Sequence, residues 1–387
     1  MHIPKAELSK WLEVNVQTGT VSASASPEGG RVEALDLLRL AAVFGVMCFH
    51  FCFYGPELNG KPFVAFPEWA GFAKYGYLGV QLFFVISGFV IGYSAVGRNA
   101  STFAIARFSR IYPAFFFCMT LTFLVTLTLG QGFFEAPLKQ WFANLFIVST
   151  ALKQPYVDGV YWTLILELTF YAWVYVLIAG GVFPRYILPL LVGWFAVSLF
   201  NELWLGSHMM RKLLLTDQCG FFASGLLIYE ISRGRGNAVV QTLLGCAAVV
   251  AVVSAVRHAD EMHEMTGGNF DVSIVAALAL CCVAITVIAA RLPKLPISQK
   301  VTSLLGGITY PLYLLHQMIG YVAFLLLSKH FSAGPLLAAI VVSVAVASWA
   351  VWRFVDRPGQ RATKTLLTKA VARGTVALQS RMVPQAA

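Results

Sequence analysis

The chain of 387 residues is 58% hydrophobic and only 12% charged, with a formal net charge of +10. Soluble globular domains carry about 25% charged residues, so this composition excludes a soluble domain. The apolar segments are continuous rather than alternating, and several exceed the roughly 20 residues that cross a bilayer as a helix. The sequence therefore predicts an all-α, polytopic membrane protein.

About ten membrane helices are expected along the chain, the sixth of them short. They form one membrane domain, residues 31–360, between a flexible N-terminal tail, residues 1–30, and a basic C-terminal tail, residues 361–387. The apolar segment 141–152 is too short to span and is expected to be re-entrant or interfacial. The expected helices cover residues 34–54, 75–96, 110–129, 161–181, 186–203, 218–232, 238–256, 272–290, 301–327 and 335–354.

The orientation follows from the distribution of lysine and arginine between the two sets of loops. The set that includes both tails holds 20 of the 28 basic residues, and the other set holds the remaining 8. Because cytoplasmic loops carry the excess of Lys and Arg, both termini are predicted to be cytoplasmic. The same bias accounts for the net charge, so a nucleic-acid partner is not needed to explain it.

The first expected helix carries a notable pair of polar residues, Arg39 and His50, eleven positions apart. At about 100° per residue, eleven steps return to within roughly 20° of the starting direction, so both side chains would lie on one helix face, about 16 Å apart. An ionisable group deep in the membrane is costly and therefore a functional candidate. The alternative is a histidine hydrogen-bonded between packed helices.

The third expected helix begins with two further arginines, Arg107 and Arg110, at the same membrane surface as Arg39. They are three positions apart and so lie on neighbouring parts of one face. Three guanidiniums at one level can form an anion site, and arginine suits phosphate because its planar fork donates two parallel hydrogen bonds. The alternative for Arg107 and Arg110 is ordinary positive-inside anchoring.

Two more ionisable residues fall in the middle to outer half of the membrane, Glu167 in the fourth helix and His316 in the ninth. A carboxylate beside an imidazole can fix its tautomer and raise its basicity, so Glu167 is a candidate partner of His50. Structural hydrogen bonding between helices is the alternative for Glu167 and the preferred interpretation for His316.

The outer loop 257–271 contains histidines and acidic residues in the order RHADEMHEMTGGNFD. Such side chains can bind a metal, but no pair has a recognised ligand spacing. A solvated loop is therefore the favoured interpretation, and we expect no metal site.

Six segments between residues 31 and 360 stand out together. They are the opening helix with Arg39 and His50, YLGVQLFFVISGFVIGY from Tyr77, ARFSRIYPAF with Arg107 and Arg110, YWTLILELTFYAWV with Trp162, Glu167 and Tyr171, GGITYPLYLLHQ with Tyr310 and His316, and RFVDRPGQ. In this order they resemble the acyltransferase 3 family of integral membrane O-acyltransferases. Leu38 and Leu40 differ from the glycine of many members, and Gln81 and Asp356 replace a frequent Asp and Glu.

The resemblance implies a ten-helix domain in a bacterial cytoplasmic (inner) membrane that transfers an acyl group, usually acetyl, from cytoplasmic acyl-CoA. The usual acceptor is a hydroxyl of a cell-surface or exported saccharide or glycolipid. Arg39, Arg107 and Arg110 would bind the phosphates of coenzyme A, and Glu167 would orient or polarise the reacting groups. His50 would act as general base or first accept the acyl group itself. Supporting roles would fall to Asp36, Trp162, Tyr171, Tyr310 and His316.

Two alternatives remain open from the sequence. Within the enzyme class, the acceptor can be a small diffusible molecule such as a macrolide. Outside it, a transporter or flippase also places ionisable groups inside the membrane. No repeated half with paired Gly- or Pro-broken helices is present, although many transporters show one. Turnover of acyl-CoA by the purified protein separates these classes.

Overall fold

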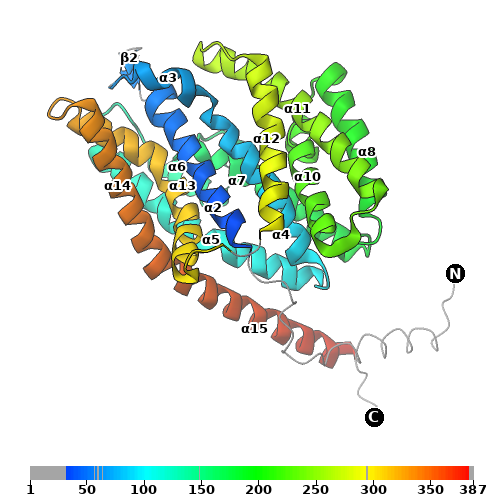
Figure 1. Cartoon of the computed structure of the whole chain (residues 1–387). Coiled ribbons are helices and arrows are strands. Elements are labelled where there is room, and N and C mark those ends of the chain that lie inside the picture. The colour runs from blue at the N-terminus through cyan, green and yellow to red at the C-terminus, as the bar shows by residue number, and fades with distance from the viewer. Residues whose placement is uncertain are drawn as a thin grey trace, which may run out of the picture.

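The computed structural model describes residues 32–55, 57–58, 61–62, 64–147, 149–292 and 295–382. The predicted N-terminal tail, residues 1–30, lies outside this described part. The protein is a bundle of helices (Figure 1). Its long helices are α2 (Glu33–Cys48), α4 (Gly79–Ala95), α5 (Ala100–Leu129), α7 (Trp162–Ala179), α8 (Ile187–Phe200), α10 (Cys219–Glu230), α11 (Ala238–Thr266), α12 (Val272–Arg291), α13 (Gln299–Leu327), α14 (Ala333–Val351) and α15 (Arg357–Met382).

Short elements complete the fold at the ends of these helices. They are α3 (Pro67–Ala73), α6 (Leu138–Asn144), α9 (His208–Leu214) and an antiparallel hairpin of β1 (Glu57–Leu58) and β2 (Lys61–Pro62). Short helices α6 and Ser149–Leu152 occupy the segment expected to be re-entrant or interfacial.

Nine helical segments in the described residues are long and apolar enough to cross a membrane. Helix α10 is shorter, with 12 residues, and corresponds to the sixth expected helix. Almost all of its side chains are buried between α4 and α11. The prediction of an all-α, polytopic membrane protein is therefore confirmed, with α10 as a short, enclosed member of the bundle.

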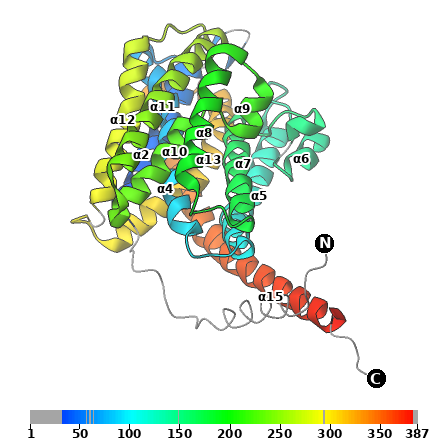
Figure 2. The ribbon, with the colours of Figure 1, turned by 90° about the vertical axis from the view of Figure 1, so that its right-hand side faces the viewer.

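Three helices extend beyond their predicted bounds. Helix α5 begins at Ala100 instead of residue 110, because the Asn99 side chain accepts a hydrogen bond from the Thr102 N–H and caps it. Helix α11 continues to Thr266, so most of the expected outer loop 257–271 is helical. It ends where Gly267 adopts a positive φ of 67°. In the predicted C-terminal tail, α15 follows α14 after the π-helical stretch Trp352–Asp356 and projects from the bundle (Figure 2).

Alternating connections place the ends of the helices on two faces of the bundle. The face on which α2 begins, α4 ends and α5 begins is called the basic face here, because Arg39, Arg107 and Arg110 lie nearest to it. The face on which α2 ends beside α3 is called the opposite face.

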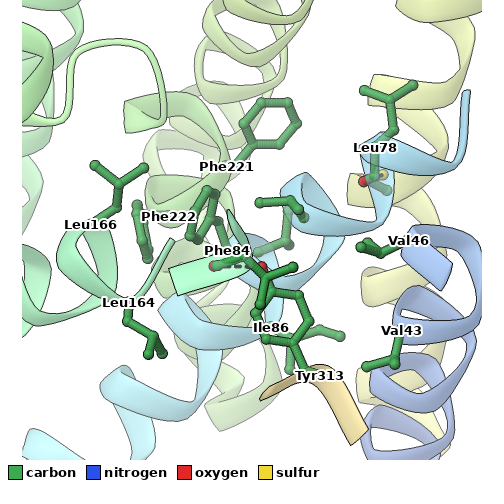
Figure 3. Packing of buried hydrophobic residues seen from close by; sticks show 14 of the residues in the cluster. Val43, Val46, Leu78, Phe84, Ile86, Leu164, Leu166, Phe221, Phe222 and Tyr313 are labelled. Carbon is green, nitrogen blue, oxygen red and sulfur yellow. Dashed lines mark hydrogen bonds between the residues drawn. The ribbon is translucent and has the colours of Figure 1, made fainter. Parts of the chain in front are cut away.

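The core depends on close packing of α4 against α10. A Cβ atom on Gly88 would lie 2.1 Å from the Phe222 carbonyl oxygen, and one on Gly225 would lie 2.0 Å from that of Val85. Only glycine permits this approach. Lipid tails are as apolar as the side chains, so helices in a membrane associate through close packing, which small residues allow. The ring of Phe222 then packs against that of Phe84 at a centroid distance of 4.7 Å (Figure 3). It also stacks on the ring of Phe170 at 4.2 Å.

Candidate functional site

Two cavities lie between the central helices, one toward each face of the bundle. The cavity toward the basic face, called the arginine cavity, has a volume of about 230 Å³. Its polar lining residues are Arg39, Ser87, Arg107, Arg110, Thr163, Glu167, Tyr171, Thr309, Tyr310 and Tyr313. The cavity toward the opposite face, called the histidine cavity, has a volume of about 520 Å³ and is lined by His50, Gln81, Trp162, Asp217 and Gln317 among others.

The three arginines that line the arginine cavity come from α2 and α5. The Arg39 guanidinium donates to the Asp36 carboxylate at 3.1 Å, and that of Arg110 donates to Asp356 at 3.4 Å. Asp356 is fully buried and is held in place by a hydrogen bond from the Gln360 amide. These carboxylates compensate two of the three guanidiniums, and the pairing offsets the cost of burying the Asp356 charge.

Arg107 differs from the other two arginines. Its Nε is buried and has no hydrogen-bond partner among the described residues. Its guanidinium lies 5.7 Å from the centre of the Tyr171 ring, an attractive cation–π contact that leaves its donors unused. Of the three arginines, Arg107 therefore has the most hydrogen-bond donors available, and an anion bound in the cavity can accept from them.

Glu167 lies in the arginine cavity, not beside His50. The hydroxyl groups of Ser87 and Tyr171 both donate to its Oε1. Tyr171 is one turn further along α7, so the sequence places the carboxylate and its donor on one helix face. The expected pairing of Glu167 with His50 is thus not present. Tyr310 completes this cavity, with its hydroxyl donating to the Ile111 carbonyl at 3.2 Å.

The hydrogen-bond partner of His50 is His316, whose Nε2 lies 2.9 Å from His50 Nδ1. His316 Nδ1 lies 2.8 Å from the Tyr313 carbonyl oxygen, which can only accept, so this nitrogen carries the proton. In the neutral pair, His316 Nε2 then accepts from His50 Nδ1–H. This chain leaves His50 Nε2 as the unprotonated nitrogen, the form that a base or nucleophile needs.

His50 lies in an unusual backbone segment, the π-helical stretch Phe49–Tyr54 that ends α2. Such stretches are rare and frequently occur at functional sites. The His50 carbonyl accepts from the Gly55 N–H at 2.7 Å and from the Tyr321 hydroxyl at 3.3 Å. The histidine is therefore held by both its ring and its backbone.

The segment before α7 supports His316 from the other side. Leu314 carbonyl accepts from the Tyr161 hydroxyl at 3.3 Å, and the Met318 N–H donates to the Asp158 carboxylate at 3.0 Å. These two backbone groups are four residues apart and would pair with one another in a regular helix. Burial raises the pKa of the Asp158 carboxyl to about 7, despite hydrogen bonds from the N–H groups of Met318 and Val160 that lower it.

A thin partition separates the two cavities. Tyr313 and Val80 line both of them. The Tyr313 hydroxyl lies 2.8 Å from that of Thr163, and its ring packs edge-on against Phe83. The side chains of Tyr313 and Val80 therefore lie between the arginines and His50.

Charged groups on the rim of the histidine cavity are mostly paired. Arg211 bonds to Glu202 and Glu261, and Glu261 also contacts His258 at 3.0 Å. Burial raises the pKa of the nearby Asp217 carboxyl to about 6. Trp162 lines the same cavity with its side chain partly exposed. In the described residues, no group of three or more His, Cys, Asp or Glu side chains is arranged to hold a metal.

The structure thus separates the candidate residues into two groups. Arg39, Arg107, Arg110, Glu167, Tyr171 and Tyr310 line the arginine cavity, with Asp36 bonded to Arg39, whereas His50 and Trp162 line the histidine cavity, with His316 bonded to His50. Sequence reasoning did not single out Ser87, Asp158, Tyr313 or Gln317. Ser87, Tyr313 and Gln317 lie within quoted segments and Asp158 lies just before one, but only their contacts with other helices identify them as part of the site.

Comparison with known proteins adds independent findings. A family model described as "Acyltransferase domain" matches residues 32–353. Nodulation protein 10 of Rhizobium leguminosarum bv. viciae is 31% identical over 164 residues, which cover 37% of this chain and 43% of that protein. The match therefore spans less than half of the relative's length. No solved structure shows a significant match.

Proposed function

The chain belongs to the family of this membrane acyltransferase domain, and from this premise we propose that it transfers an acyl group from acyl-CoA to a hydroxyl group. The acyl group is acetyl in this proposal, and the acceptor is a saccharide or glycolipid at the cell surface or in export. The observation that supports it most strongly is the pair of adjacent cavities, one lined by arginines and the other by a histidine with a free ring nitrogen.

The arginine cavity suits the donor. Phosphate groups of coenzyme A bind the guanidiniums of Arg39, Arg107 and Arg110 near the basic face. The pantetheine arm then carries the thioester past Tyr313 toward His50. His50 lies eleven residues beyond Arg39, a rise of about 16 Å along the helix axis, in the π-helical stretch that follows α2. Glu167, bonded to Ser87 and Tyr171 in this cavity, positions the donor rather than the imidazole.

The histidine cavity suits the acceptor and the chemistry. His50 Nε2 removes the proton from the acceptor hydroxyl while its oxygen attacks the thioester carbonyl carbon. The bond from that carbon to sulfur breaks, an ester forms, and the sulfur leaves as the thiol of coenzyme A after taking a proton. In the alternative sequence of steps, His50 Nε2 attacks first and the acyl group passes from the imidazole to the hydroxyl.

The test uses purified protein and a deletion strain of the source organism. Detergent-purified protein is expected to release coenzyme A thiol from acetyl-CoA, and the deletion strain should lack an ester-linked acyl group that the complemented strain carries on its surface glycans. Thiol release with unchanged glycans would favour a small diffusible acceptor. A protein that binds but never cleaves acyl-CoA would contradict the proposal and favour a flippase.

A further inference from the structure

The histidine cavity contains buried polar groups that the chemistry above does not use. Tyr77, Gln81 and Gln317 line it, and their side chains are only 5%, 2% and 8% exposed. The Tyr77 hydroxyl and the side-chain oxygens of Gln81 and Gln317 have no hydrogen-bond partner within the described chain. A buried polar atom without a partner destabilises a protein. Four such atoms line this cavity, these three and Asp217 Oδ1, and they indicate that something else supplies the partners.

These three residues reach the cavity from different elements around His50. Tyr77 and Gln81 are four positions apart at the start of the helix that continues into α4, so they lie on one face of it. The Tyr77 ring packs edge-on against Phe49, the neighbour of His50. Gln317 directly follows His316 on α13. The unpartnered atoms therefore come from helices on either side of the proposed catalytic nitrogen.

The chemistry of these atoms points to the ligand they fit. The amide oxygens of Gln81 and Gln317 accept hydrogen bonds, and the Tyr77 hydroxyl both donates and accepts. Neutral acceptors of this kind match the hydroxyl groups of a ligand. Aromatic residues Tyr54, Tyr156 and Trp162 line the same cavity and offer flat apolar faces. This combination suits a ring that carries several hydroxyl groups.

We propose that Tyr77, Gln81 and Gln317 form a subsite that binds the acceptor through hydroxyl groups flanking the one that reacts at His50. The acceptor is accordingly a polyhydroxylated ring rather than a simple alcohol. This inference rests on the proposed acyl transfer, and it names the residues that select the acceptor.

The Gln81→Leu and Gln317→Leu variants test the subsite, because leucine is similar in size but has no polar atoms. Each single variant should lower glycan acylation in the complemented deletion strain about tenfold, and the double variant should lower it further. Acetyl-CoA binding, measured on purified protein, should stay at the wild-type level, because the proposed donor site is the separate arginine cavity. The native acceptor is present in these cells, so its identity need not be known.

A stability measurement separates binding from a structural role. Because the Gln81 side-chain oxygen has no partner in the empty protein, Gln81→Leu should keep or raise the melting temperature. Gln140 is the matched control, since it is also buried but its amide donates to the Tyr156 carbonyl at 2.8 Å. Gln140→Leu should therefore lower the melting temperature.

Gly159→Ala provides a second, independent perturbation of the subsite. A Cβ atom there would lie 2.7 Å from the Gln317 side-chain oxygen and would displace it without removing it. Acylation should fall as for Gln317→Leu. Wild-type glycan acylation in the Gln81→Leu, Gln317→Leu double variant would overturn the subsite alone. Absence of acyl-CoA cleavage by wild-type protein would instead overturn the proposed function.

Discussion

The reactivity of His50 depends on which of its ring nitrogens carries the proton. The sequence of hydrogen bonds from the Tyr313 carbonyl through His316 places that proton on Nδ1 and leaves Nε2 free. His316 therefore has a positioning role in the proposed mechanism, although its sequence context indicated only a structural hydrogen bond. His316 has both roles, because the structural hydrogen bond that it makes to another helix is the one that positions the candidate base, His50.

We predict that His50→Ala abolishes acyl transfer while acetyl-CoA binding and folding are retained. A positioned general base contributes about 10²–10⁴-fold in rate, so the loss should be close to complete. The measurement is transfer per mole of folded, purified protein, with donor binding on the same sample. His330→Ala, at an exposed position, is the control. Activity of His50→Ala within a few-fold of wild type would exclude His50 as the base.

A different substitution tests the tautomer. His316→Ala removes the acceptor of the His50 Nδ1–H and should lower the turnover rate about 10²-fold, because the ring loses its orientation. His316→Gln retains an acceptor oxygen and should recover part of this loss. Comparing turnover and donor KM in the two variants is the measurement. Equal activities in alanine and glutamine variants would show that the hydrogen bond is irrelevant to turnover.

The three arginines should not contribute equally to donor binding. Arg107→Ala should weaken acetyl-CoA binding by about 10-fold or more, because it removes charge-assisted hydrogen bonds from donors that the protein leaves unused. Arg107→Lys should restore binding only in part, since lysine lacks the bidentate fork. Titration of donor binding on purified protein provides the affinities. Unchanged affinity in Arg107→Ala would remove this residue from the donor site.

At the scale of the element, the contact between α4 and α10 carries a clear expectation. Gly88→Ala should destabilise the protein by about 1–3 kcal/mol, because its Cβ would overlap the Phe222 carbonyl in a packed core. Gly245→Ala on α11 is the matched control, since nothing lies within 4 Å of its added Cβ. Thermal unfolding in detergent compares the two. A Gly88→Ala protein as stable as the Gly245→Ala protein would contradict this packing argument.

The ends of elements also show where local sequence competes with tertiary contacts. Helix α5 starts where Asn99 caps it, and α11 ends at Gly267, so both ends follow rules readable from the chain. The π-helical segment Phe49–Tyr54 has no such cap or breaker inside it. Its carbonyl contact with Tyr321 on α13 shows that a neighbouring helix helps to hold this geometry.

For the whole molecule, the main testable property is its orientation in the membrane. We predict that both termini are cytoplasmic, as the distribution of basic residues implies. Cysteine introduced at exposed Asn269 should react with a membrane-impermeant maleimide on intact cells, whereas Ala362→Cys on α15 should react only after the cells are opened.

This labelling requires a background in which Cys246 and Cys281, the exposed native thiols among the described residues, are replaced by alanine. The reverse labelling pattern would show that the arginine cavity faces away from cytoplasmic acyl-CoA, and the proposed donor site would then be untenable.

The sequence by itself determined the membrane class and the approximate positions of the helices. These are local properties, set by the length of apolar runs and by the helical period, and they need no knowledge of neighbouring helices. The resemblance of six ordered segments likewise depended only on their order along the chain. The sequence also placed Arg39, Arg107 and Arg110 at one membrane level, and the structure shows that all three line one cavity.

Only the tertiary structure decided which ionisable groups meet. His50 and His316 are 266 positions apart, and Glu167, expected beside His50, pairs with Ser87 and Tyr171 instead. Depth in the membrane can be counted along a helix, but the rotation of one helix relative to another depends on packing such as that of Gly88 and Gly225. Because that packing sums many weak contacts between distant segments, no local pattern specifies it.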